Sequence, residues 1–584
     1  MNKSNLRALL TPIVLALAIV FGMMLNRFLP DRTQVSASSE MFLPVTGSKL
    51  DLIISMIQNS YVDTVDTRQI VENTIPVLLK DLDPHTVYIP AKDMQRANEG
   101  IVGNFGGVGI QFYKYLDTVT VVKVVPGGPS EKAGIKDGDR IVRVNDSLVA
   151  GVKMSQDKIQ ELMRGELGTK VELTIARRGE PQLIKKEVVR GSIPVKSVDV
   201  AYMLNDTTGY LKTNTFGMHT YAEFMQALVK LKAEGMRKII IDLRENEGGV
   251  LPIAIQMINE FLDADRLILY TQGQAQPRTD YKSNGKGQFK DLRVDVLISE
   301  FSASASEIFA GAIQDNDRGL IIGRRSFGKG LVQEQRMLPD GSALRLTVAR
   351  YYTPSGRSIQ KPYNEGKEKY YNDIYNRLVH GEFSQKDSIV FDENLKYQTV
   401  GGRTVYGGGG IMPDVFVPQD TTGVTSYLSS VINRGLTLQF TFQYTDNNRK
   451  KLSQYETEED LLNYLRHQGL VEQFIRFADS KGVKRRNILI QKSYKRLEAN
   501  IYGNIIYNML GLEAYLKYFN KSDATVQQGI ELLEKGEAFP KAPAETEEEV
   551  TKDNKDGKKK RTAQAYGITE DPTRIFDFAE ASIS

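Results

Sequence analysis

The stretch Phe301-Ser-Ala-Ser-Ala-Ser-Glu307, followed by Phe327-Gly-Lys-Gly330, decides how this chain is understood. It offers serine hydroxyls and, 25 positions after Ser304, a lysine. A hydroxyl needs a nearby base to become a nucleophile at neutral pH, and a neutral lysine can be that base. The chain has four histidines, and none lies in either segment. The pattern therefore predicts nucleophilic chemistry that does not use histidine.

Both segments belong to longer ordered motifs. The lysine lies in Gly323-Arg-Arg-Ser-Phe-Gly-Lys-Gly-Leu-Val-Gln333, which is followed by Leu344-Arg-Leu-Thr-Val-Ala-Arg-Tyr-Tyr-Thr-Pro-Ser-Gly-Arg357. Together with residues 301–315 these motifs resemble the carboxy-terminal processing proteases, which are tail-specific serine peptidases of family S41. The resemblance extends from about residue 45 to residue 425. It implies an α/β fold with a crotonase-like (ClpP/crotonase-type) serine protease core and an inserted PDZ domain.

The resemblance assigns the two central roles. Periodicity cannot separate Ser302, Ser304 and Ser306, but the alignment with the family and the spacing to the lysine select Ser304 as the nucleophile. Lys329 is then the general base. A free lysine has a pKa near 10.4, so work at neutral pH requires the pKa to fall by about three units, through burial or a nearby cation.

Two further residues match positions that matter in the family. Gln333 matches a glutamine that orients the lysine, and it can do so from a helix at i, i+4 or from an extended strand. Asp315 matches an aspartate that some members need for catalysis. The same residue can equally cap the end of its helix or form a salt bridge there, and the sequence leaves both interpretations open.

An oxyanion hole is expected from backbone N–H groups near the serine. The resemblance points to the N–H of Ala305 together with that of Gly248 or Gly249. Family members carry Asn-Pro-Gly-Gly at this turn, whereas this chain has Asn246-Glu247-Gly248-Gly249. Glutamate in place of proline predicts a less rigid turn.

Residues 101–190 resemble a PDZ domain. In Gly106-Gly-Val-Gly-Ile110, the residues Gly107, Val108, Gly109 and Ile110 are similar to the loop that binds a terminal carboxylate, and the following strand is expected to pair with an incoming peptide. Arg164 lies in Arg164-Gly-Glu-Leu-Gly-Thr169, at a position where the arginine of some family members senses substrate docking. An ordinary solvated arginine is the alternative.

Composition and periodicity divide the rest of the chain. The expected parts are a cytoplasmic tip and signal anchor at 1–30, a linker and helical region at 31–100, the PDZ domain at 101–190, the protease core at 191–425, an added helical domain at 426–540 and a charged, disordered tail at 541–584. Helical spacing predicts helices at 50–61, 70–79 and 492–519. Residues 358–408 are expected to form an irregular insertion near the active site.

The amino-terminal region predicts a membrane anchor. Residues 8–25 form an uncharged, mostly apolar run of 18 residues, preceded by Lys3 and Arg7. That length suits a spanning helix better than a signal-peptide core, and basic residues hold their end in the cytoplasm. The catalytic part is therefore expected in the bacterial cell envelope, in the periplasm or outside, with a cleaved and secreted form as the alternative.

Composition narrows the function classes. The formal net charge of +4 gives no reason to expect nucleic acid as a partner, and the chain has no cysteine. No metal or cofactor motif is present in the sequence, so no cofactor is expected. The expected substrate is an unstructured protein carboxy-terminus, with a homodimer or an adaptor protein as possible further partners. The alternative is a non-catalytic PDZ and crotonase-like binding or scaffold protein.

Overall fold

The computed structural model describes residues 48–115 and 117–536. The described residues fall into two compact units, which are divided between Thr74 and Ile75. The predicted anchor at residues 8–25 and the charged tail at 541–584 lie outside the described residues. Among the residues that are described, no helix is long and apolar enough to cross a membrane.

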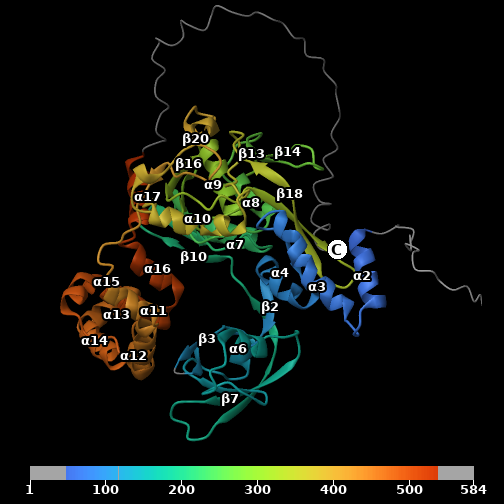
Figure 1. Cartoon of the computed structure of the whole chain (residues 1–584). Coiled ribbons are helices and arrows are strands. Elements are labelled where there is room, and N and C mark those ends of the chain that lie inside the picture. Colours follow the sequence, from blue (N-terminus) through green and yellow to red (C-terminus); the bar gives the residue numbers. More distant parts are fainter. Residues whose placement is uncertain (1–47, 116, 537–584) are drawn as a thin grey trace, which may run out of the picture. The chain divides into compact units, whose positions relative to one another are not determined.

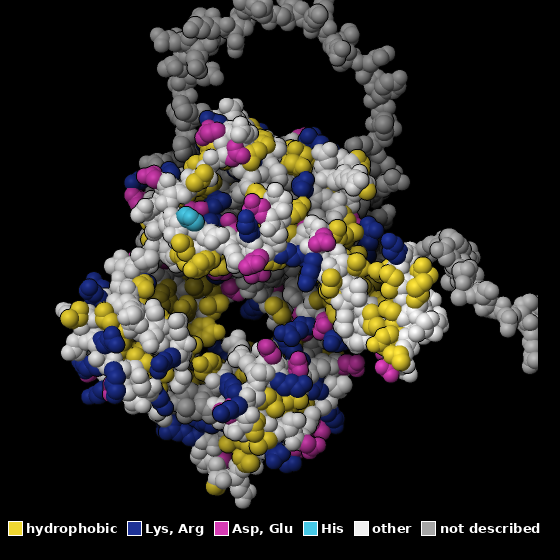
Figure 2. All heavy atoms as spheres, in the orientation of Figure 1, with side chains coloured by type: hydrophobic (Ala, Val, Ile, Leu, Met, Phe, Trp, Pro, Cys, Tyr) yellow, Lys and Arg dark blue, Asp and Glu magenta, His cyan; other side chains and the backbone are white. Residues whose placement is uncertain are grey.

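The described part of the first unit is helical. It contains α2 (Lys49–Ser60), which starts with a capping box between Ser48 and Asp51, and the beginning of α3 (Thr67–Leu78). No residue of either helix is buried, and Leu50, Ile53 and Met56 are exposed along α2. Hydrophobic side chains gather along this helix in Figure 2. The homodimer expected from the sequence stays a prediction.

The protease-like core is built on a six-stranded sheet in the order β10-β11-β12-β15-β16-β21. Strands β10 and β16 of this sheet are labelled in Figure 1. All neighbouring pairs are parallel except β10 with β11. The strands are β10 (Val198–Met203), β11 (Thr208–Thr213), β12 (Lys238–Asp242), β15 (Arg293–Ile298), β16 (Gly319–Gly323) and β21 (Val415–Phe416). The apolar runs of β12 and β15 fit such a sheet, because both of its faces are covered.

Side chains of the sheet strands alternate between two hydrophobic cores, one on each face of the sheet. On one face, Ile239 and Ile241 pack with residues of α7 (Thr220–Ala233), α8 (Leu251–Asn259) and α9 (Ala305–Asp315). On the other face, Ile240 packs with residues of α16 (Leu512–Asn520) and α17 (Ala524–Lys535). The sheet is therefore a middle layer, as the crotonase-like α/β prediction requires.

This packing changes the predicted division of the carboxy-terminal region. Val526 and Leu533 of α17 are buried against the core sheet, because their apolar stripe meets Ile240 and Ile322. A separate helical core is formed by α11 (Ser426–Asn433), α12 (Leu436–Leu452), α13 (Glu458–Arg466), α14 (Leu470–Ser480) and α15 (Asn487–Leu510). The single helix expected over 492–519 is interrupted at Gly511, whose φ of 87° lies in the left-handed region.

A second sheet carries the lysine side of the site. It contains β1 (Val87–Ile89), β18 (Ala343–Tyr352), β13 (Leu267–Gln272) and β14 (Thr279–Lys282), and β17 (Leu331–Met337) pairs with β18. Gln333 therefore lies on an extended strand, not on a helix. The insertion at 358–408 is more regular than expected, since it contains α10 (Lys367–Val379) and the hairpin of β19 (Lys396–Gln398) and β20 (Thr404–Tyr406).

The PDZ region is a separate sheet with its own core. Its strands run in the order β3 (Ile110–Tyr115), β4 (Thr118–Val124), β5 (Arg140–Val144), β7 (Lys170–Ala176) and β8 (Ile184–Val189), with β6 (Ser147–Leu148) paired to β5 and the helices α5 (Pro129–Lys132) and α6 (Gln156–Met163). A short ladder of β2 (Asn104–Gly107) and β9 (Gly191–Pro194) closes the domain, and α4 (Met94–Val102) precedes it. Strand β3 is at the edge of its sheet.

Candidate active site

Ser304 stands at the turn between β15 and α9. It is the residue that caps α9, and its φ is 53°, a conformation that is unusual for a residue with a side chain. The neighbouring hydroxyls of Ser302 and Ser306 are buried and donate to the carbonyls of Leu243 and Asn246, at 2.8 Å each. These two serines hold the turn, and Ser304 is the partly exposed serine that a substrate can reach.

The side chain of Glu307 connects the serine turn to the lysine turn. Its Oε2 accepts the backbone N–H of Ser304 at 2.9 Å and that of Lys329 at 2.8 Å. Its Oε1 accepts the N–H of Gly328 at 2.7 Å and the hydroxyl of Ser326 at 2.5 Å. Burial raises the pKa of this fully buried carboxyl, and the four donated hydrogen bonds oppose that rise.

The hydroxyl of Tyr351 makes a second connection between the same two residues. It donates to the carbonyl of Lys329 at 2.7 Å and lies 3.2 Å from the carbonyl of Ser304. The tyrosine comes from β18 and is almost fully buried. The backbones of Ser304 and Lys329 are thus tied together through both their N–H and their C=O groups.

Lys329 is held in surroundings that favour its neutral form. Burial is the largest cause of its lowered pKa, Arg345 adds to the effect, and Glu307 and Glu247 oppose it. Its ammonium donates to Gln333 Oε1 at 3.1 Å and makes no ion pair among the described residues. Lys361, another buried lysine nearby, differs because it pairs with Asp373 at 3.1 Å.

Gln333 is in turn oriented by the backbone of His85, whose carbonyl accepts its Nε2–H at 2.7 Å. The imidazole of His85 bonds the hydroxyl of Tyr370 at 2.8 Å, and burial lowers its pKa to about 4, with Lys329 adding to the shift. The histidine is therefore neutral at physiological pH. It supports the lysine through Gln333, in agreement with a structural role for this residue.

The turn Asn246–Gly249 brings backbone donors to the serine. A Cβ at Gly248 would lie 2.8 Å from both Ser304 Cβ and the Ala305 nitrogen, so this close approach requires glycine. The N–H of Gly248 is engaged with Asn246 Oδ1 at 2.9 Å. The N–H groups of Gly249 and Ala305 have no partner among the described residues. Gly249 and Ala305 are therefore the better donors for an oxyanion, and Gly248 provides the space.

Asp315 does not contact Ser304 or Lys329 among the described residues, and its predicted catalytic role stays a prediction. It is at the end of α9 opposite to Ser304, where it is fully buried and pairs with Arg357 at 2.7 Å. It also accepts the hydroxyl of Ser355 at 2.7 Å. Of the two interpretations that the sequence left open, the salt bridge at the helix end is the one present here.

The PDZ residues lie where the carboxylate loop was predicted. Gly107 ends β2, Val108 and Gly109 form the connection, and Ile110 begins β3. Arg164 follows the last turn of α6, its guanidinium pairs with Glu99 of α4, and its Cζ lies 4.4 Å from the centre of the Phe105 ring. Arg164 is therefore not a free surface side chain, because it joins the PDZ helix to the segment that leads into the domain.

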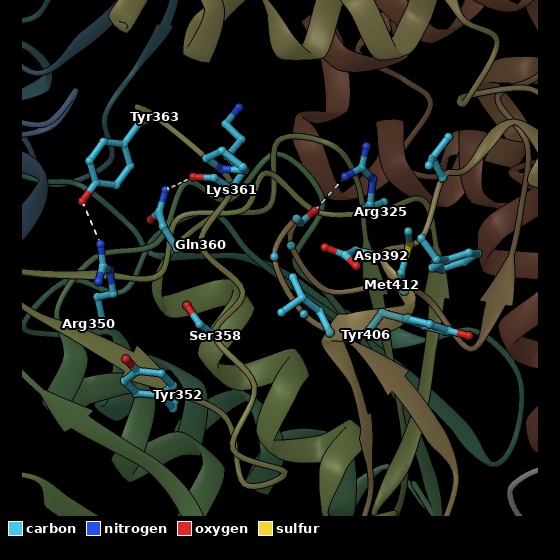
Figure 3. Close-up of a pocket in the computed structure, with 18 of the residues that line it drawn as sticks. Arg325, Arg350, Tyr352, Ser358, Gln360, Lys361, Tyr363, Asp392, Tyr406 and Met412 are labelled. Atoms are coloured by element: carbon cyan, nitrogen blue, oxygen red, sulfur yellow. Dashed lines mark hydrogen bonds between the residues drawn. The ribbon is translucent and has the colours of Figure 1, made fainter. Parts of the chain in front are cut away.

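A cavity of about 590 Å³ lies beside the lysine turn (Figure 3). Gln360 connects the two, because its Oε1 accepts the N–H of Gly330 at 2.8 Å. The walls come from residues 358–364, 390–395 and 406–412, together with Arg325, Arg350 and Tyr352. The insertion predicted near the active site thus supplies most of the lining of a space next to the lysine turn.

Sequence reasoning missed two residues that organise this site. Glu307 follows Ser304 in the pattern Ser-x-x-Glu, which is a capping-box signal, but that signal does not show that the same carboxylate also binds the lysine turn. Tyr351 lies 47 residues after Ser304, and no local pattern connects them.

Comparisons with known proteins identify domains in this chain. Residues 207–366 match the model of peptidase family S41 and residues 120–177 match a PDZ domain, while residues 427–511 match a family of unknown function. The chain therefore contains a peptidase S41 domain and a PDZ domain, followed by a further helical region. This confirms the predicted fold class.

Among curated proteins the chain is similar to the CtpA-like serine proteases. It is 33% identical over 314 residues to the protein of Staphylococcus epidermidis and 34% identical over 313 residues to that of Staphylococcus haemolyticus. Each match covers 53% of this chain and 62% of the relative, so the chain spans about three fifths of the length of these relatives.

Solved structures of the same kind are also similar. The photosystem II D1 carboxy-terminal processing protease is 25% identical, with 64% of this chain and 94% of that chain covered and a TM-score of 0.33. An S41 protease from Bacteroides fragilis is 16% identical, with 60% and 99% covered and a TM-score of 0.34.

The charges around Lys329 predict two opposite shifts of the pH profile. If neutral Lys329 is the base, kcat/KM rises as pH rises through its pKa. Arg345→Gln removes a cation that lowers this pKa, so the rising limb is expected to move to higher pH. Glu247→Gln removes an anion that raises the pKa, so the limb is expected to move to lower pH. The measurement is kcat/KM on an unfolded substrate across pH 5 to 10.

Arg336→Gln, on the same strand as Gln333 but paired with Glu334 at the surface, is the control and should leave the limb in place. Shifts of both site variants in the same direction, or no shift in either, would contradict Lys329 as the titrating base.

Proposed function

We propose that this chain is a serine endopeptidase that cleaves proteins near their carboxy-termini with a Ser304–Lys329 dyad. One observation carries the proposal: the two residues share the carboxylate of Glu307 and the hydroxyl of Tyr351, while burial lowers the pKa of Lys329. The S41 and PDZ domains and the CtpA-like relatives support the same function.

We propose the following reaction for these groups. Ser304 Oγ attacks the carbonyl carbon of the scissile peptide while its proton passes to neutral Lys329 Nζ. The N–H groups of Gly249 and Ala305 bind the negative oxygen of the tetrahedral intermediate. When the C–N bond breaks, the leaving amine takes the proton from the Lys329 ammonium, and an ester on Ser304 remains. Water gives a proton to Lys329 and attacks the ester carbonyl. When the bond to Ser304 Oγ breaks, the Lys329 ammonium returns the proton to this oxygen, which releases the carboxylic acid product and restores the serine and the neutral lysine.

The PDZ domain is proposed to select the substrate. The backbone at Val108, Gly109 and Ile110 would bind the terminal carboxylate of an unstructured tail, and the edge strand β3 would pair with the residues before it. A scaffold without catalysis is the weaker alternative, because a binding role gives no reason for a buried lysine without an ionic partner beside a strained serine.

The dyad is tested by removing each member. Ser304→Ala and Lys329→Ala are each expected to lower kcat on an unfolded, tailed substrate by at least about 10³-fold, because nucleophile and base act as one unit. Lys396→Ala, at an exposed lysine, is the control and should keep the parent rate. The measurement is turnover, together with labelling of the protein by a fluorophosphonate. Turnover by all variants would exclude the dyad, and an unlabelled, inactive parent that still binds peptide would favour the scaffold.

Arg164 is proposed to transmit tail capture to the oxyanion turn. It pairs with Glu99 of α4, and the carbonyl of Ile101 in α4 accepts the N–H of Met218 at 2.8 Å. Two residues before Met218, Phe216 bonds both Gly248 and Val250, at 2.9 and 2.7 Å. A continuous set of contacts therefore joins the PDZ helix to the turn that would hold the oxyanion.

Arg164→Ala is expected to lower the acceleration that a cleavable protein gains from its free tail by about fivefold, the effect of a coupling of about 1 kcal/mol. Binding of a tail peptide should stay within about twofold of the parent, since Arg164 is outside the carboxylate loop. Arg143→Ala, at an exposed arginine of the same domain, is the control. Full tail-dependent acceleration in Arg164→Ala would show that the arginine has a purely local role.

We further propose that residues 8–25 anchor the protein in the cytoplasmic membrane, with the catalytic part in the cell envelope. The support is the length and apolar character of the run and the basic residues before it. The full chain is expected to sediment with membranes and to resist a high-salt wash. Leu15→Lys with Ala18→Lys is expected to release it, because each lysine adds about 3 kcal/mol to the insertion free energy. Recovery of the parent in the soluble fraction would contradict an anchor.

A further inference from the structure

The peptide-binding edge of the PDZ domain faces the helical domain across a cavity of about 520 Å³. One side of the cavity is formed by Ile110–Tyr113 of β3, by Val122 of β4 and by Gln160 of α6. The other side is formed by residues of α12, α15 and α16, among them Leu438, Tyr507 and Tyr515. These helices lie within and beside the region that matches a family of unknown function.

Polar contacts connect the two domains next to this cavity. Arg140 of β5 pairs with Asp446 of α12 at 2.8 Å, and Arg178 donates to the Asp446 carbonyl at 2.9 Å. The hydroxyl of Tyr113 is close to Gly435, which caps α12. The cavity is therefore bounded by direct contacts between the PDZ strands and α12.

The edge of β3 determines what can enter. On one side β3 pairs with β4, and its other backbone edge has no strand partner among the described residues. Four consecutive residues of β3, Ile110 to Tyr113, line this cavity, and two of them, Ile110 and Phe112, also pack against the PDZ core. An extended peptide that pairs with this edge sends alternate side chains to opposite faces. One row would meet α6 and the PDZ core, and the other would meet the helical domain.

The lining selects the chemistry of this peptide. The described residues around the cavity include leucine, isoleucine, phenylalanine, tyrosine, asparagine and glutamine, and none is Lys, Arg, Asp or Glu. A charged side chain would lose its water here without gaining an ionic partner, which is unfavourable. Apolar and aromatic side chains can be buried, and the amides can bond a peptide backbone.

We infer that the helical domain is the second wall of the tail-binding groove, and that it binds one of the two alternating rows of uncharged, apolar side chains in the last residues of a substrate. This inference rests on the proposed function, because it adds a specificity surface to the same capture site. It gives a role to a region whose family has no known function. The PDZ domain alone would bind the terminal carboxylate and one row of peptide side chains, and the helical domain would bind the other row.

The test measures binding of a fluorescent peptide that ends in Val-Phe-Val-Phe-Ala with a free carboxylate to the full chain carrying Ser304→Ala. Leu438→Ala and Tyr507→Ala change exposed wall residues, so the fold should tolerate them. Ile432→Ala and Tyr494→Ala are matched controls: the exposed fractions are 44% and 43% for Leu438 and Ile432, and 36% and 46% for Tyr507 and Tyr494. Each wall variant is expected to bind about fivefold to tenfold more weakly, as expected for the loss of one apolar contact, and the controls are expected to bind as the parent does.

Two further peptides separate a wall from a general disturbance. In one peptide, both phenylalanines are replaced by alanine. In the other, both valines are replaced by alanine. If the helical domain contacts one row, the wall variants lose their effect with one of these peptides and keep it with the other. An equal loss with both peptides would contradict contact with a single row.

The outcomes distinguish this inference from the proposed function. If the parent cleaves and binds tailed substrates but Leu438→Ala and Tyr507→Ala bind as tightly as their controls, the second wall is wrong and the peptidase remains. Tighter binding by the wall variants would also overturn it, since the helices would then obstruct the groove. If the parent neither binds a free carboxy-terminus nor cleaves, the proposed function fails and the inference fails with it.

Discussion

The buried carboxylate of Glu307 is the interaction on which the site depends. It accepts hydrogen bonds from two turns that are far apart in sequence. One is the turn at Ser304, which follows a strand of the core sheet, and the other is the turn at Gly328 and Lys329, which leads into β17. A buried carboxylate that lost these donors would be strongly destabilised, so the carboxylate and the two turns require each other. The position of Lys329 beside Ser304 is therefore a consequence of backbone geometry more than of any contact between their side chains.

The same arrangement resolves an electrostatic conflict. A carboxylate next to a lysine normally forms an ion pair, which raises the pKa of the lysine and would remove it as a base. Here the oxygens of Glu307 are occupied by backbone N–H groups and a hydroxyl, and the ammonium of Lys329 bonds the neutral amide of Gln333 instead. Burial then outweighs the remaining attraction, and the pKa of Lys329 is lowered. The carboxylate fixes the backbone position of Lys329 without pairing with its ammonium.

Sequence patterns predicted the architecture well, because the apolar runs, glycine turns and motif order are local signals. They failed where tertiary contacts decide. Asp315 is in a family motif, but its role depends on Arg357, 42 residues away. The sequence has 27 tyrosines, and nothing in it distinguishes Tyr351. Only its position on β18 shows that its hydroxyl contacts the carbonyls of Ser304 and Lys329. Helix α17 looked like part of a separate domain, and its packing on Ile240 could not be seen from periodicity, which shows that a helix has an apolar stripe but not which surface covers it.

The carboxy-terminal helices connect these observations. One part of this region, α16 and α17, packs on the back of the core sheet, whereas α12 contacts the PDZ domain through Asp446. A helical region that packs on the core sheet through α16 and α17 and contacts the PDZ domain through α12 limits how these two domains can move. The sheet face opposite to Ser304 is thus used for attachment, which leaves the face with α9 and the turn Asn246–Gly249 for chemistry. The added helical region therefore packs against the protease-like core and also contacts the PDZ domain.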